Sequence, residues 1–269
     1  MFRREKLLPL RAVACNMPRR NWTREELIVA FNLYCKIPFG RIHIRNPTVI
    51  ELAKAIGRTP SAVSWKLANF ARLDPALRKR NISGATHGAQ AEVEIWREFS
   101  GDWETLAFES ERLLDEITGH TAKFVEDPQI FPEGATREAL IRVRVNQGFF
   151  RAGVLAAYDV RCCITGLSIP QLLTASHIVP WSVDTKNRTN PKNGLCLNAI
   201  HDRAFDSGLM TVTPEMTFKI SSKISKNRTD GTARQFLFKY ERASVTLPRR
   251  FAPSADFLRY HNEKIFLGP

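Results

Sequence analysis

Residues 162–208 read CCITGLSIPQLLTASHIVPWSVDTKNRTNPKNGLCLNAIHDRAFDSG, and this stretch decides the fold of the C-terminal half. His177 ends a short apolar and β-branched run, and Asn193 precedes the run Gly-Leu-Cys-Leu. His201 lies in a helix-like segment that stops at Asp206-Ser207-Gly208. The order predicts a strand, a long polar loop, a second strand and a helix.

This arrangement suits the hydrolysis of a phosphate ester. A histidine at a strand end can face a helix that packs back across the hairpin. One imidazole could then take a proton from water, while the other holds a divalent cation that neutralises charge on the phosphate. Asn193 could tie the loop down with its side-chain amide. Because a single histidine is more often structural than catalytic, the prediction depends on the ordered set.

Three motifs carry a family resemblance: SHIVPW at 176–181, NPKNGL at 190–195 and HDRAFDSGL at 201–209. They resemble the motifs of the HNH endonuclease family, which has a ββα-metal fold. The resemblance implies that His177 is the general base, that Asn193 is the structural asparagine of the loop, and that His201 is a metal ligand.

One position departs from the family pattern. Many relatives carry an acid or a histidine immediately before the base as a second metal ligand, and this chain has Ser176 there, a weak ligand. Either water replaces the missing ligand, or Asp206 or Asp202 contributes. His201 and Asp206 are about 140° apart around a helix. Asp206 could therefore equally be a helix-end packing residue.

Composition favours a soluble protein with a polyanionic partner. The 269 residues are 43% hydrophobic and contain neither a long apolar span nor a signal peptide, so we expect a cytoplasmic location without membrane association. The net charge is +13, while residues 91–138 hold 13 of the 27 acidic residues. The positive charge elsewhere predicts a polyanionic partner, and the resemblance to HNH endonucleases implies that this partner is double-stranded DNA. Five cysteines without a Cys-x-x-Cys pair predict no structural zinc.

The N-terminal region predicts a helix-turn-helix. Thr23, Pro47 and Thr59-Pro60 mark the starts of three helices, the last two running from about Pro47 to Ile56 and from Pro60 to about Arg72. Small, glycine and β-branched residues at Ala53, Gly57 and Val63 have the spacing of that motif. The third helix would enter the major groove. The expected DNA contacts are Arg58, Ser61, Ser64, Trp65, Lys66 and Asn69. The alternative is an ordinary three-helix domain that docks on the nuclease.

We therefore predict an α+β protein with a helical, helix-turn-helix-like domain and an HNH ββα-metal domain. The expected boundaries are a basic leader at 1–20, a helical domain at 21–118, a linker at 119–136 and the nuclease domain at 137–269. We expect the acidic helices of 91–118 to be a solvated spacer packed on the first domain; the alternative is a homodimer contact or an acidic element that repels DNA. Within the nuclease region we expect a helix at 148–159, a hairpin at 209–221, a basic loop at 223–236 and a closing helix at 254–266. Arg144 and Arg151 are candidate phosphate contacts.

The predicted activity is metal-dependent cleavage of DNA with one Mg²⁺ or Mn²⁺ ion per site, in a restriction or defence role. The N-terminal motifs WTREEL and ELAKAIGRTPSAVSWKLANFARLDP resemble a domain found before HNH modules of restriction-type proteins. Two alternatives remain: a non-catalytic DNA-binding regulator on a decayed HNH scaffold, and an RNA-directed nuclease.

Overall fold

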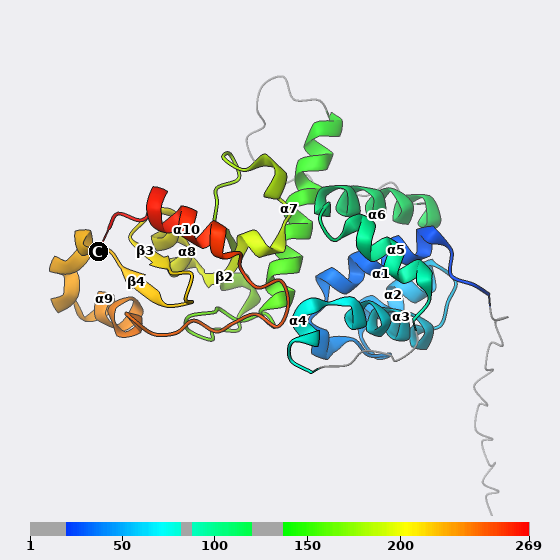
Figure 1. Cartoon of the computed structure of the whole chain (residues 1–269), viewed down its shortest axis with the longest axis horizontal. Helices are drawn as coiled ribbons and strands as arrows, with labels where there is room; N and C mark the ends of the chain where they lie inside the picture. The colour runs from blue at the N-terminus through cyan, green and yellow to red at the C-terminus, as the bar shows by residue number, and fades with distance from the viewer. Residues whose placement is uncertain (1–19, 82–87, 120–136, 269) are drawn as a thin grey trace, which may run out of the picture.

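The computed structural model describes residues 20–81, 88–119 and 137–268, and the side chains of its longest helix from residue 141 onward. A helical N-terminal part lies beside a mixed C-terminal part, and the long helix α7 stands between them (Figure 1). The predicted leader falls outside the described residues except for Arg20, and so does the predicted linker except for Gly119. The N-terminal elements are α1 Arg24–Lys36, η1 Phe39–Arg41, α2 Pro47–Ala55, α3 Pro60–Leu73, α4 Pro75–Arg78, α5 Gln90–Phe99 and α6 Trp103–Thr118.

Helix α1 is the centre of the N-terminal part. Thr23 and Glu26 form a capping box that fixes where the helix begins. Every residue from 26 to 35 is buried, because α3, α5, α6 and α7 all pack around α1. A helix surrounded in this way is apolar on most of its faces.

Helices α2 and α3 follow the predicted register closely. Gly57 takes the left-handed conformation, with φ of +63°, in the turn between them. Ala53 and Val63 are buried on either side of that turn. The predicted apolar seam is buried as well, at Leu52, Ile56 and Leu67.

Helix α7 runs from Arg137 to Ala157 and begins eleven residues before the predicted start. It packs against α1 and α6 on one side and against β1, β2 and η4 on the other. Its buried Phe149 and Val154 belong to a single apolar core that extends from Leu27 to Leu258. The two predicted regions therefore share one core.

The C-terminal part contains two small antiparallel hairpins. The first pairs β1 Leu173–His177 with β2 Gly194–Asn198, with His177 opposite Gly194, and helix α8 Ala199–Asp206 follows directly. The second hairpin is the predicted one. The remaining elements are η2 Pro170–Leu172, η3 Thr185–Asn187, η4 Pro191–Asn193, β3 Met210–Val212, β4 Phe218–Ile220, η5 Ser222–Thr229, α9 Gly231–Phe236, η6 Phe238–Tyr240 and α10 Ala255–Lys264.

The basic segment 223–236 is helical, so the prediction of a loop was wrong. Ser221 caps η5, and Asp230 caps α9 by accepting a hydrogen bond from the amide of Ala233. Among the described helices, none has the length and apolar character needed to cross a bilayer.

Arg250 joins the two parts of the chain. Its guanidinium is fully buried and donates hydrogen bonds to the carbonyls of Tyr34 and Ile37 at the end of α1. It also lies over the ring of Tyr34, 4.5 Å from the centroid. An arginine from the C-terminal region thus caps the central N-terminal helix.

Candidate active site

The strand β1 ends at His177, whose ring is held from three sides. It stacks on Phe150, with 3.7 Å between ring centroids and 9° between planes, and Trp181 contacts its edge. Nε2 lies 2.9 Å from the carbonyl oxygen of Arg188. Since a carbonyl only accepts, Nε2 carries the proton and Nδ1 keeps its lone pair. No described group hydrogen-bonds to Nδ1, so this atom can accept a proton from water.

The environment of His177 favours its neutral form. Burial lowers the pKa of His177 below the usual 6.5, although the Arg188 carbonyl acts in the opposite direction by stabilising the charged ring. A neutral imidazole with a free Nδ1 is the form that a general base requires.

Asn193 fixes the loop that follows His177. Its side chain is fully buried; Oδ1 accepts a hydrogen bond from the amide of Val179 at 2.8 Å, and Nδ2 donates to the Val179 carbonyl at 3.0 Å. Nδ2 also reaches the carbonyl of Asn187. These bonds hold both ends of residues 178–193 together and so place the carbonyl that orients His177.

Helix α8 presents two carboxylates to the same pocket as His177. Asp202 and Asp206 are four residues apart, about 40° around the helix axis, so they share one face. The pocket has a volume of about 690 Å³. Its walls also include Ser176 from β1 and Lys264 from α10. A base, two acidic groups and an ammonium group therefore line one cavity.

The pKa values of both carboxyls are raised. Burial is the main cause for each, and the charge of Asp202 raises the pKa of Asp206 further. The hydroxyls of Ser176 and Thr174 lie near Asp202 and partly offset its burial. Nevertheless Ser176 Oγ is buried without a partner in hydrogen-bond geometry among the described residues. A bound cation would offset the charges of the two carboxylates and give Ser176 Oγ a partner.

The oxygen set fits a hard divalent ion. Mg²⁺ is commonly bound through one or two carboxylates, with water and substrate phosphate completing the shell. In the described parts of the chain no group of three or more His, Cys, Asp and Glu side chains converges. Protein ligands would therefore be few: Asp202, Asp206 and the Ser176 hydroxyl.

His201 lies elsewhere, which corrects its expected role as metal ligand. It is buried; Nε2 donates to the Phe236 carbonyl at 2.8 Å, and Nδ1 accepts from the side-chain amide of Asn198 at 3.0 Å. Its ring contacts Phe218 and Tyr240. Both ring nitrogens are occupied: Nε2 carries the proton, and the lone pair of Nδ1 is taken by the Asn198 amide, so neither is free to bind a metal. It anchors α8 to the second hairpin and α9.

The arrangement of two strands, an anchored loop and a helix agrees with the comparison to known families. Residues 162–213 match the sequence model of a family described as HNH endonuclease. This segment, which is similar to that family, is called the HNH domain below. No curated protein matches the chain.

Two side chains that line the HNH pocket, Asp202 and Lys264, were not among the main predictions from the sequence. Asp202 was only an alternative metal ligand, although its spacing of four residues from Asp206 indicates a shared helix face. Lys264 had no sequence signal, because α10 reaches the HNH domain from about 60 residues farther along the chain. His261 also lines the pocket, but Thr211 and the Phe205 carbonyl occupy its ring nitrogens, and burial lowers its pKa to about 4.

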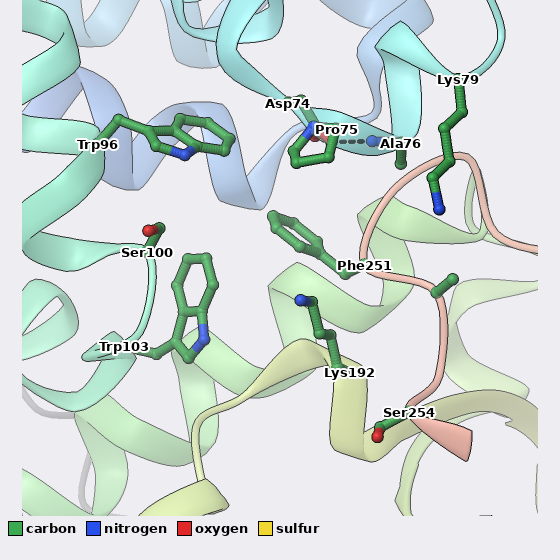
Figure 2. A pocket seen from close by; sticks show the side chains of 11 residues that line it. Asp74, Pro75, Ala76, Lys79, Trp96, Ser100, Trp103, Lys192, Phe251 and Ser254 are labelled. Carbon is green, nitrogen blue, oxygen red and sulfur yellow. Dashed lines mark hydrogen bonds between the residues drawn. The ribbon is translucent and has the colours of Figure 1, made fainter. Parts of the chain in front are cut away.

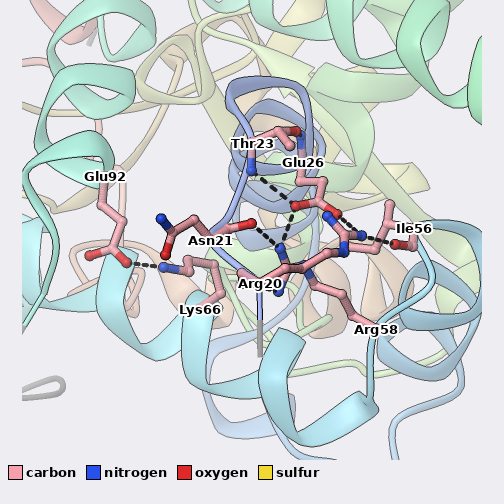
Figure 3. Close-up of polar contacts among 8 residues, drawn as sticks. All are labelled: Arg20, Asn21, Thr23, Glu26, Ile56, Arg58, Lys66 and Glu92. Atoms are coloured by element: carbon pink, nitrogen blue, oxygen red, sulfur yellow. Dashed lines mark hydrogen bonds and ion pairs between the residues drawn. The ribbon is translucent and has the colours of Figure 1, made fainter. Parts of the chain in front are cut away.

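Three expected DNA contacts on the N-terminal part are engaged within the protein, and Figure 3 shows two of them, Arg58 and Lys66. Arg58 bonds the carboxylate of Glu26 at 2.6 Å and lies over the ring of Trp22. Lys66 is buried and pairs with the fully buried Glu92. Asn69 donates to the same carboxylate. Arg58, Lys66 and Asn69 therefore stabilise the helical bundle and are not available to DNA.

The other candidate contacts lie nearer the surface. Trp65 is 64% exposed on α3, Ser61 is exposed and Ser64 is half-buried. Arg151 is exposed on α7 and donates to the carbonyl of Pro170, and Arg144 is half-buried.

Proposed function

We propose that the protein is a metal-dependent endonuclease that hydrolyses phosphodiester bonds of double-stranded DNA. The observation that carries the proposal is the shared pocket of His177, Asp202 and Asp206 within an HNH domain. Retention of an oriented, neutral imidazole beside two carboxylates favours catalysis over a decayed scaffold, because a binding module needs neither group.

His177 would act as the general base. Nδ1 takes a proton from a water molecule, and the bond from Nε2 to the Arg188 carbonyl stabilises the charged ring that forms. Stacking on Phe150 fixes the plane of the His177 ring, which lines the pocket. The hydroxide would attack phosphorus while Lys264, at the pocket wall, attracts the phosphate.

Asp202 and Asp206, with Ser176 Oγ, would hold one Mg²⁺ or Mn²⁺ ion. When bound, the ion supplies positive charge that stabilises the pentacovalent phosphate and the leaving oxygen. With so few protein ligands, affinity in the absence of DNA would be weak.

Recognition of DNA would fall to the basic surface and to α3. The net charge of +13 supports a polyanionic substrate. The exposed Trp65, with Ser61 and Ser64, forms the outward face of α3. A restriction or defence role rests on the sequence resemblance of the N-terminal region.

The test is cleavage of supercoiled plasmid with and without Mg²⁺. His177→Ala should lower the rate about 10²–10⁴-fold. His43→Ala is the matched control, since His43 is exposed and does not line the pocket, and it should retain activity. Metal-independent cleavage, or a folded His177→Ala protein with normal rate, would reject the mechanism. Preferential cleavage of structured RNA would reject the substrate.

Trp65→Ala tests α3. Because the side chain is largely exposed, folding stability should change little, while duplex affinity should fall several-fold. Unaltered duplex affinity would show that α3 does not contact DNA.

A further inference from the structure

A second pocket lies at the junction of the N-terminal helices and the HNH region (Figure 2). It has a volume of about 410 Å³. Figure 2 shows the rings of Trp96, Trp103 and Phe251 around one opening. Trp103 and Phe251 pack edge to face, with centroids 5.3 Å apart. The rest of the lining is Asp74, Pro75, Ala76, Lys79, Ser100, Lys192, Ala252 and Ser254.

The polar lining of this pocket is positive. Lys79 and Lys192 are both exposed, and neither forms an ion pair with any residue in the described part of the chain. Asp74 also lines the pocket, but its carboxylate is fully used. One oxygen accepts from the hydroxyl of Tyr34 at 2.8 Å and the other from the amide of Ala76 at 2.9 Å. The available charges therefore favour an anion.

The pocket adjoins the loop that organises the active site. Lys192 directly precedes Asn193, the residue that holds residues 178–193 in place. The carbonyl of Lys192 accepts a hydrogen bond from the amide of Ser254, so the Phe251 segment is tied to the same loop. A ligand in this pocket would touch the N-terminal helices and the HNH loop together.

We propose that this pocket binds one nucleotide, with the base against the aromatic rings and the phosphate between Lys79 and Lys192. Aromatic rings stack on any base, and ammonium groups recognise phosphate, so the lining suits both halves of a nucleotide. The volume lies in the range of small-ligand sites. Because the inference rests on a nucleic-acid substrate, the nucleotide comes either from the bound strand, unstacked, or from solution as a free mononucleotide.

The test measures binding by the full chain in EDTA, so that it is independent of cleavage. One arm titrates dAMP, dCMP, dGMP and dTMP by calorimetry, with deoxyribose 5-phosphate for comparison. The other arm follows the fluorescence of 2-aminopurine in a duplex, which rises when that base leaves the stack. The test variants are the pair Lys79→Ala with Lys192→Ala, and Ala252→Trp, which fills the opening. The control pair Lys223→Ala with Lys226→Ala removes the same charge from exposed positions on η5.

The expected result is a signal in at least one arm that falls about tenfold or more in both test variants and little in the control pair. If the test variants lose the calorimetric signal, the ligand is a free nucleotide. If they lose the fluorescence signal, the ligand is an unstacked nucleotide of the bound strand. No signal in either arm, an equal loss in the control pair, or equal binding of deoxyribose 5-phosphate would overturn the proposal. If the pocket proposal fails but the protein still cleaves plasmid, the proposed nuclease function stands. If the pocket binds a nucleotide but the protein does not cleave plasmid, only the proposed nuclease function is rejected.

Discussion

His201→Ala should unfold the HNH domain more than it disturbs its chemistry. The sequence motif makes His201 look like a metal ligand, but the ring is buried and bonded at both nitrogens. Replacing it with alanine leaves the Phe236 carbonyl and the side-chain amide of Asn198 without their hydrogen-bond partner. It also removes the contacts with Phe218 and Tyr240.

The cost can be worked from these contacts. Each buried polar group left unpaired costs about 1–3 kcal/mol, and the lost ring volume adds a cavity term. Because Asn198 is only half-buried, its contribution lies at the low end of this range, and the total loss of folding stability is about 3–5 kcal/mol. For a chain of this size each kcal/mol lowers Tm by about 2–4 °C, so we expect a fall on the order of 10 °C.

Asp202→Asn is the contrasting variant. It keeps the shape of the side chain but removes a half-buried charge whose raised pKa shows that ionisation is unfavourable there. Its Tm without metal should stay level or rise, whereas Mg²⁺ affinity and cleavage should fall about 100-fold. Thermal denaturation, calorimetry with Mg²⁺ and plasmid cleavage on the same preparations separate the two roles.

One result would refute this reasoning. If His201→Ala melts within about 2 °C of the wild type and yet loses Mg²⁺ binding, His201 is a ligand and the ring must turn toward the pocket. Normal Mg²⁺ binding by Asp202→Asn would show separately that Asp202 is not a ligand.

Three further predictions concern pH and buried charge. Cleavage should stay near maximal at pH 7 and reach half its maximum below pH 6.5, because burial lowers the pKa of His177; a midpoint above 6.5 contradicts a neutral, desolvated base. Without metal, Asp202→Asn should be the more stable protein at neutral pH. This difference in stability should shrink as pH falls through the raised folded-state pKa of Asp202 and be gone below about 4, where the carboxyl is protonated in both folded and unfolded chains; a difference that grows at low pH reverses the assigned sign. Glu92→Ala leaves Lys66 buried and unpaired and should lower the free energy of unfolding by about 3–5 kcal/mol, measured by chemical denaturation. The double variant Glu92→Leu with Lys66→Met should recover much of this stability. Equal losses of stability in the two proteins would mean that packing, not charge, dominates.

Local signals in the sequence were sufficient for most of the secondary structure. Thr23 and Thr59 cap helices where a cap was expected, because a cap depends on residues within one turn. The helix expected to begin near Pro47 does so, and Asn46 caps it. The strand, loop, strand and helix around His177 follow from local apolar runs and turn residues in the same way. The basic segment 223–236 was misread because its charge suggested a loop, whereas caps at Ser221 and Asp230 make it helical.

The side-chain partners were harder to predict because they are distant in sequence. Adjacent residues differ by 100° around a helix. Deciding whether His201 or Asp202 is the candidate metal ligand therefore requires knowing which face of α8 packs on the hairpin. Likewise Lys66 would suit DNA by its position on α3, but Glu92 on α5 neutralises it from 26 residues away. Only the packed structure decides between these alternatives.

Arg250 shows why the two regions act as one body. Its guanidinium bonds carbonyls more than 200 residues away and lies over Tyr34, whose hydroxyl in turn donates to Asp74. Hydrogen bonds from a charged donor contribute about 1.5–3 kcal/mol each, and their loss on separation would leave α1 without its cap. Opening between the N-terminal helices and the HNH region is therefore unfavourable. The nucleotide pocket beside Phe251 consequently has a fixed wall on each side, and a ligand there would be held at a constant position relative to Asn193 and the loop that orients His177.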